Sequence, residues 1–406
     1  MDNGLRVLIE PSESPLSSLC VSYEVGYADD PEGLRGLAHL TEHLMFQPTR
    51  EVREGYLTFY EQLGATIVQG VTTADYTVYC ATVPEEALDL ALFAEAERMG
   101  FMLESLYDDR IQRELRILAH ERRERSRRSL SRDAELAMSA SLWGERHPYR
   151  HRVENLDALD LDTVRWFHQR TYGPAHATVA IVTARPVDET LASVSRHFET
   201  LRGLRSSPEP RAEAPRRTAP ERIEVGVRTR RNELVLTWIT PAWLTREDAA
   251  LDLAADVLRE RLRERWPHAT ARVHSRLHAS DFEIRVTGDI RVDPAMLESQ
   301  VGRLVTELPR MDDESCERAR ERWATRERDD NQRAHSLATA NPASRDGDPV
   351  GSDAIRRRYA DLECDFVRET AARWLTPASR HASHVRFDPE APWEGRVLPR
   401  RGFHAR

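Results

Sequence analysis

The chain has 406 residues, of which 40% are hydrophobic and 31% are charged, and its formal net charge is −9. This length predicts about two domains, and no stretch approaches the roughly 18 consecutive apolar residues of a membrane-spanning helix. All 59 basic residues are arginine, which excludes chemistry on a lysine Schiff base and disfavours nucleotide chemistry of the P-loop kind. The negative charge argues against a nucleic-acid partner.

The first elements along the chain are two predicted strands and a helix. Runs rich in valine, leucine and isoleucine predict strands at 5–10 and 18–26. Two glycines then lead into the string HLTEH at residues 39–43, and Pro48 ends the helical pattern. Because Leu37, Leu40 and Leu44 have helical spacing, this helix packs on a core and its histidines share a definite face.

The string HLTEH predicts a metal site. Histidines four residues apart lie on one helix face, one turn apart, so His39 and His43 can share one metal ion. The order H-x-x-E-H is the inverted zincin motif, and zinc held by two imidazoles and a carboxylate keeps an open position for water. Glu42 is then the expected general base. The alternative is an amphipathic helix whose polar side faces water.

The third ligand has to come from another element. Alternation over 65–83 predicts two further strands, and helices are predicted at 85–102 and 108–128. The second of these helices carries Glu114 and Glu121, which are seven residues apart and therefore lie on one stripe. One carboxylate could bind zinc while the other supports the site. A solvated helix face is the alternative for both.

The remaining pattern divides the chain into halves. Helical patterns near 132–143 and 160–171 precede a short apolar strand at 176–183. Residues 206–220 contain four prolines and mark a linker between domains at 1–205 and 221–406. The second half repeats the order of strands followed by helices, which is typical of an α+β fold used twice. Its predicted strands are 221–227, 234–239 and 282–287, its helices 247–265, 293–307 and 313–334, and its polar, mobile loop 340–353.

The four cysteines are widely spread, and none forms a C-x-x-C pair. Cys80 lies in a strand-like run, so a buried thiol is predicted there. No basic segment followed by an apolar one opens the chain. A reducing cytoplasm is therefore the expected compartment.

The chain resembles the pitrilysin or insulinase family of zinc metallopeptidases, most of all the type of similar length that includes mitochondrial processing peptidase and its bacterial relatives. The resemblance extends well beyond HLTEH. It includes NGLRVLIE from Asn3, TTADYTVYCATVPEEALDLAL from Thr72, the helix with Glu114 and Glu121, HPYRHRVENLDAL from His147, and RWFHQRTYGPAHATVAIV from Arg165.

This resemblance implies roles for particular residues. It assigns the third zinc ligand to Glu121 and a supporting role to Glu114, and leaves the neighbouring His120 as a surface residue. It implies two similar domains, each a mostly antiparallel sheet with helices packed on it, together forming half of a clamshell. Substrate peptides would add as a strand to the edge strand at 67–72. Gln69 stands where the family often has an asparagine, with an exposed strand residue as the alternative.

The second half departs from the family pattern. Relatives carry an arginine followed seven residues later by a tyrosine, and both contact substrate. Arg263 matches the arginine, but the tyrosine position holds Thr270. Arg263 is therefore either a substrate contact or, as we favour, a helix-surface arginine.

Two functions follow from the resemblance. The first is a zinc-dependent endopeptidase or oligopeptidase that processes a peptide, with Glu42 as general base for a zinc-bound water. The second is a non-catalytic partner or scaffold subunit, which would not need the intact HLTEH, Glu114 and Glu121. Because the arginine–tyrosine side is altered, a heterodimer with a homologous partner is expected, and a homodimer is the alternative. Neither a nucleic acid nor a membrane is expected to bind.

Overall fold

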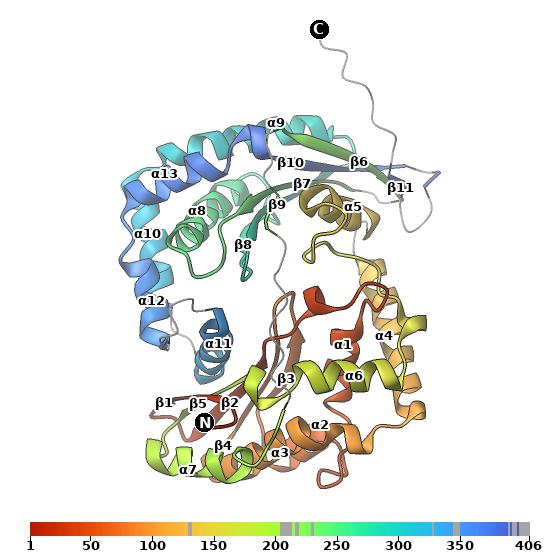
Figure 1. Cartoon of the computed structure of the whole chain (residues 1–406). Coiled ribbons are helices and arrows are strands. Elements are labelled where there is room, and N and C mark those ends of the chain that lie inside the picture. Colours follow the sequence, from red (N-terminus) through yellow and green to blue (C-terminus); the bar gives the residue numbers. More distant parts are fainter. Residues whose placement is uncertain are drawn as a thin grey trace. The chain divides into compact units, whose positions relative to one another are not determined.

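The computed structural model divides into two compact units. It describes residues 1–128, 132–203, 213–215, 219–228, 231–326, 329–343, 350–388, 390–391 and 396–397. The first unit comprises Met1–Glu121, Val153–Pro210 and Glu327–Ala354, and the second comprises Arg122–Arg152, Arg211–Arg326 and Ile355–Arg406. Each unit is built on one sheet with helices packed on it (Figure 1).

The first unit contains a five-stranded mixed sheet. Its β1 and β5 run parallel, and the other neighbours are antiparallel. In spatial order the strands are β1 (Arg6–Pro11), β5 (Ala177–Thr183), β2 (Leu16–Tyr23), β4 (Thr77–Pro84) and β3 (Ile67–Thr72). The helices of this unit are α1 (Leu37–Leu44), α2 (Tyr56–Gln62), α3 (Leu88–Phe101), α4 (Asp108–Arg128, of which the part up to Glu121 belongs here), α6 (Leu161–Thr171), α7 (Val187–Phe198) and α11 (Asp330–Ala343).

Both faces of this sheet are covered, because alternate side chains of a strand point to opposite faces. On β2, Leu19 and Val21 pack in the main core with α1, α3, α6 and α7. Cys20, between them, faces the other way and packs with Ala334, Leu337 and Ala338 of α11. In Figure 1, α11 lies on one side of the sheet and α3 on the other. Central strands covered on both faces read as continuous apolar runs.

The second unit repeats this sheet order. Removing the short β11 leaves the order β6-β10-β7-β9-β8, which matches β1-β5-β2-β4-β3 strand for strand, including the parallel first pair. In spatial order the strands are β11 (Arg396–Val397), β6 (Glu221–Val227), β10 (His381–Phe387), β7 (Arg231–Thr240), β9 (Ser280–Asp289) and β8 (Thr270–His274). The helices are α5 (Arg132–Trp143), α8 (Arg246–Arg263), α9 (Pro294–Glu307), α10 (Asp313–Ala324), α12 (Ser352–Ala360, which begins in the first unit) and α13 (Cys364–Trp374).

The units exchange one helix each. Helix α5, from the first half of the chain, packs on β6, β7, β10 and β11, whereas α11, from the second half, packs on β2, β4 and β5. The expected α+β fold with two similar, mostly antiparallel sheets is therefore confirmed. The compact units differ from the continuous domains 1–205 and 221–406, because each includes a helix from the other half of the chain.

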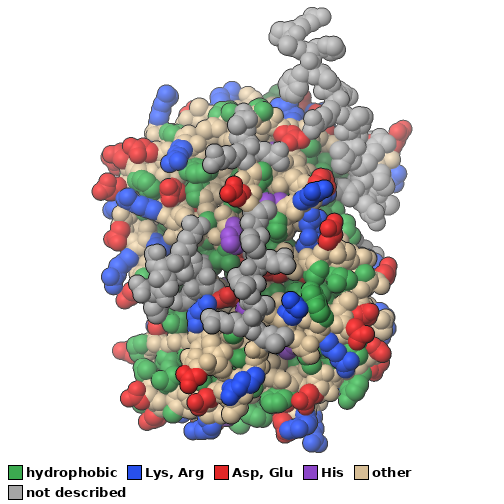
Figure 2. All heavy atoms as spheres, viewed as in Figure 1, with side chains coloured by type: hydrophobic (Ala, Val, Ile, Leu, Met, Phe, Trp, Pro, Cys, Tyr) green, Lys and Arg blue, Asp and Glu red, His purple; other side chains and the backbone are tan. Residues whose placement is uncertain are grey.

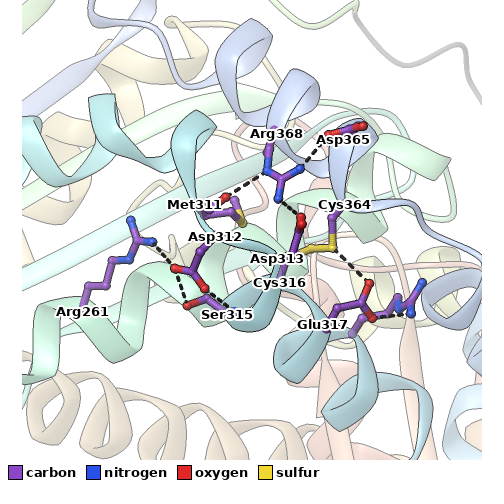
Figure 3. A network of polar contacts seen from close by, with 11 residues as sticks. Arg261, Met311, Asp312, Asp313, Ser315, Cys316, Glu317, Cys364, Asp365 and Arg368 are labelled. Atoms are coloured by element: carbon purple, nitrogen blue, oxygen red, sulfur yellow. Dashed lines mark hydrogen bonds and ion pairs between the residues drawn. A yellow bond between two sulfur atoms is a disulfide. The ribbon is translucent and has the colours of Figure 1, made fainter.

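Each unit also contains one disulfide, and the predicted buried thiol at Cys80 is wrong. Cys80 of β4 lies directly opposite Cys20 of β2 in the register and is bonded to it. In the second unit the disulfide Cys316–Cys364 joins α10 to α13 (Figure 3). Beside it, Arg368 of α13 donates to the carbonyl of Met311 at 2.9 Å, just before α10.

Other differences from the sequence predictions arise at helix ends and short strands. The helix predicted at 313–334 is two helices, α10 and α11, and α11 continues to Ala343, inside the predicted loop 340–353. The strands β8 and β10 and the helices α2, α7, α12 and α13 were not predicted. Most of the predicted linker 206–220, and residues 344–349 of the loop, lie outside the described residues. None of the described helices has the length and apolar character needed to cross a membrane.

Candidate metal centre

Helix α1 begins at Leu37, and its N-terminus is fixed by Gly36 and by the side chain of Asp30. Gly36 has a φ of 100°, a left-handed conformation that glycine adopts without steric cost. The carboxylate of Asp30 accepts hydrogen bonds from the amides of Gly36 (2.7 Å) and Ala38 (2.8 Å), so it satisfies two N–H groups at the helix N-terminus. Burial raises the pKa of Asp30 to about 7.

The two histidines of α1 lie together on the face turned away from the core. Leu37, Leu40 and Leu44 are fully buried, whereas the rings of His39 and His43 are partly exposed, with centroids 4.9 Å apart. His43 Nδ1 lies 3.2 Å from Glu114 Oε2 of α4, and His39 Nδ1 lies 3.2 Å from Glu154 Oε1. Because a carboxylate oxygen accepts, each Nδ1 is the donor in these contacts, and in a neutral imidazole this tautomer leaves the lone pair on Nε2.

Glu121 faces these two Nε2 atoms from α4. Its Oε2 lies 3.8 Å from His39 Nε2, and its Oε1 lies 3.7 Å from His43 Nε2. A tetrahedral zinc ion with bonds of about 2.1 Å separates its ligand atoms by about 3.4 Å. Each oxygen of Glu121 therefore lies close to this spacing from one of the two imidazoles, and an N/O donor set of this kind is one that zinc prefers.

Glu114 is held more firmly than Glu121. Its side chain is 5% exposed, against 42% for Glu121, and it accepts from Gln47 Nε2 at 2.8 Å as well as from His43. Both of its oxygens are thus engaged by protein donors, as expected for a carboxylate that orients a ligand. Burial by itself would lower the pKa of His43, but the nearby carboxylates, Glu114 first among them, raise it above its usual value.

Glu42 lies between the histidines and the edge strand β3. Its Oε2 accepts from the hydroxyl of Thr72 at 3.2 Å. Beside it on β3, a Cβ at Gly70 would lie 2.7 Å from Glu42 Oε1 and 2.6 Å from Phe46 Cε2. Only glycine therefore lets the β3 backbone pass this close to Glu42. Ligand atoms of His39, Glu42 and His43 lie within 4.8 Å of one another, so Glu42 also borders the metal position.

The remaining candidates lie elsewhere. Gln69 points to the opposite face of β3 from Gly70, because side chains alternate, and its amide donates to Asn331 of α11 at 3.3 Å. Arg263 belongs to the second unit, where it is exposed at the end of α8 and donates to the carbonyl of Ala269 at 3.2 Å. Their roles as substrate contacts stay predictions. His120 is exposed on α4.

Sequence reasoning missed the polar residues that hold this cluster together. Gln47 lies four residues after His43, and that spacing could have drawn attention to it. Thr72 and Glu154 carry no such local signal. They are 30 and 115 residues from their partners, so only the fold brings them near.

Comparisons with known proteins identify the relatives of this chain. The family model described as "Insulinase (Peptidase family M16)" matches residues 6–145, and the one described as "Peptidase M16 inactive domain" matches residues 158–314. The zinc protease PqqE of Helicobacter pylori is 25% identical over 273 residues, which are 64% of this chain and 60% of that protein. The chain therefore spans less than two thirds of this relative.

Solved structures show the same fold. A protease from Helicobacter pylori has a TM-score of 0.81 at 21% identity, covering 95% of this chain and 97% of that one. The periplasmic protease PqqL from Escherichia coli has a TM-score of 0.74 at 17% identity, covering 100% of this chain and 50% of that one. Since the two M16 models match successive parts of the sequence, the chain belongs to the insulinase family of peptidases, family M16.

Proposed function

We propose that this chain is a zinc metallopeptidase in which His39, His43 and Glu121 hold one zinc ion. The observation that carries the proposal is the orientation of the two imidazoles. Each Nδ1 faces a carboxylate, and each Nε2 faces Glu121. This arrangement offers three converging ligands and leaves a fourth position for water or substrate.

The chain's own residues then have separate roles in peptide hydrolysis. Zinc, when bound, supplies a Lewis acid that polarises a peptide carbonyl and lowers the pKa of water. Glu42 accepts the proton of the attacking water and passes it to the leaving amine, so its carboxylate acts first as base and then as acid. The hydroxyl of Thr72 holds one carboxylate oxygen of Glu42, and the absence of a side chain at Gly70 leaves room for the other.

We propose a peptide as substrate, bound along β3. This strand is the last in its sheet and pairs with β4 on one side. Its other edge can receive an extended peptide through main-chain hydrogen bonds, a mode that reads few side chains. Because Gly70 lies beside Glu42, such a peptide would run past the general base.

Metal analysis tests the proposal. We expect about one zinc per purified chain, and we expect His43→Ala to lose most of it because two ligands rarely hold zinc. His120→Ala is the matched control, since it removes an exposed histidine of α4. Zinc retained by His43→Ala at the wild-type level would overturn the assignment.

We further propose that the chain matures in an oxidising compartment, in place of the cytoplasm expected from the sequence. That expectation was based on the widely spread cysteines, the predicted thiol at Cys80 and the lack of a basic-then-apolar opening segment, whereas all four cysteines pair in the structure. Disulfides persist in oxidising compartments and are rare in the cytosol. Thiol titration of protein denatured without reductant should find almost no free thiol, and four thiols per chain would contradict the proposal.

A partner chain remains part of the proposal. The chain aligns with half the length of the Escherichia coli PqqL protease, so a second chain could supply the remainder. We propose a homologous partner, with a homodimer as the alternative. The mass of the purified chain in solution, measured together with its activity on a peptide library, distinguishes these two assemblies. An active homodimer would rule out the need for a different partner.

A further inference from the structure

Glu154 contacts the metal centre from a segment far along the chain. Its Oε1 lies 3.2 Å from His39 Nδ1, and the two side chains are 16% and 18% exposed. The chain leaves the first unit after Glu121 and returns at Val153. The carboxylates on either side of this excursion, Glu121 and Glu154, therefore both reach His39.

The backbone around Glu154 is fixed against the loop that precedes α1. The amide of Asn155 donates to the carbonyl of Arg35 at 2.8 Å, and its side chain donates to the carbonyl of Gly33 at 2.8 Å. The next residue, Leu156, is buried in the main core. Glu154 is thus held in place from the backbone, independently of its contact with His39.

Gly36 leaves the space that Glu154 occupies. A Cβ at Gly36 would lie 3.1 Å from both Cβ and Cγ of Glu154, and the φ of 100° disfavours any other residue there. The glycine that starts the helix with the two histidines therefore also admits the carboxylate that contacts the first of them.

We propose that Glu154 is a positioning residue for the metal centre, a role that rests on the proposed zinc site. Its carboxylate accepts a hydrogen bond from His39 Nδ1–H, which fixes the tautomer of His39 and turns Nε2 towards Glu121. Glu114 does the same for His43. Carboxylates that bond a metal-binding histidine in this way orient the ring and increase its basicity. Each histidine of HLTEH thus has its own carboxylate, supplied by a different element.

Zinc affinity, measured by competition with a chromophoric chelator, tests the proposal. We expect Glu154→Ala to bind zinc about 10- to 100-fold more weakly than the wild type. Asp157→Asn is the matched control, because it removes one exposed negative charge three residues away. The visible spectrum of the cobalt-substituted protein reports ligand geometry, so we expect it to change in Glu154→Ala and to stay unchanged in Asp157→Asn.

The possible outcomes separate this inference from the proposed function. If the wild type binds no zinc, the proposed function fails. If the wild type binds zinc and Glu154→Ala binds it equally tightly, the function stands and the positioning role is overturned. An equal weakening in Asp157→Asn would also overturn it, since charge alone would then explain the loss. If Glu154→Ala does not fold, as judged by circular dichroism of the metal-free protein, Glu154→Leu, which also lacks an acceptor, takes its place under the same criteria.

Discussion

The two units share one strand order but use it for different chemistry. In each, a helix follows the second strand of the unit: α1 follows β2, and α8 follows β7. In α1 the polar face carries His39 and His43, which meet carboxylates. In α8 two carboxylates are buried, and they meet arginines: Asp248 bonds Arg358 at 3.2 Å, and Asp256 bonds Arg322 at 2.6 Å.

This difference shows that position in the fold does not determine function. Within the described parts of both units, one group of three potential metal ligands is found, and it lies on α1. An arginine–carboxylate pair already places a cation against the carboxylate, which disfavours a metal ion at the same oxygens. A histidine–carboxylate pair leaves Nε2 available for a metal.

Acidic and basic side chains are interspersed over the visible surface (Figure 2).

Removing the carboxylate of Glu42 on α1 is expected to have the largest effect on activity. We expect Glu42→Gln to keep zinc but to cleave a peptide about 10²- to 10⁴-fold more slowly, because an amide cannot accept the proton. Glu260→Gln changes a glutamate on α8 that pairs with Arg322, and we expect it to keep wild-type activity. Cleavage of a fluorogenic peptide measures both. Normal turnover by Glu42→Gln would contradict the role of base.

The part of the site that could be predicted is the part encoded locally. His39, Glu42 and His43 share one turn of helix, and Glu114 and Glu121 share one stripe of α4, so helical periodicity relates them directly. Their mutual approach depends on the fold. The resemblance to a known family implied that the two helices meet and that Glu121 is the zinc ligand. The residues alone left Glu114 and Glu121 interchangeable in the roles of ligand and supporting carboxylate.

The features that could not be predicted depend on long-range register. Cys20 and Cys80 pair because β2 and β4 place them opposite each other, and no local pattern encodes that register across 60 residues. The packing of α5 on the second sheet and of α11 on the first sheet could not be predicted for the same reason. Each is an ordinary helix in sequence, and only tertiary contacts show which sheet it covers.

The disulfides allow the stability of the units to be compared. Cys20–Cys80 closes a separation of 60 residues and Cys316–Cys364 one of 48. The loop-closure estimate is about 4 kcal/mol for either length. We therefore expect the double replacements Cys20→Ser/Cys80→Ser and Cys316→Ser/Cys364→Ser to lower the free energy of unfolding by similar amounts, measured by urea titration. A change below about 1 kcal/mol in either would contradict the contribution of that disulfide.

The helix caps differ in their response to pH. The native pKa of Asp30, which caps α1, is raised by burial from its usual 3.8 to about 7. The native state therefore holds this proton more tightly than the unfolded chain, and the stability from Asp30 is largest below pH 4 and is lost as pH rises towards 7. We expect the cost of Asp30→Ala to grow as pH falls from 7, by at most about 1.4 kcal/mol per pH unit. A cost that is constant, or that grows with pH, would contradict this.

The smallest effect is expected at the corresponding cap of α8. The hydroxyl of Thr245 accepts from the amide of Asp248 at 3.2 Å, and no group in that bond gains or loses a proton between pH 4 and 7. Thr245→Ala should therefore lower the free energy of unfolding by about 1 kcal/mol, and this cost should not change over that range. Thr245→Ser keeps the hydroxyl and should restore most of the loss. If the cost of Thr245→Ala instead followed pH as that of Asp30→Ala does, the pH response would belong to helix capping in general and would no longer distinguish α1 from α8.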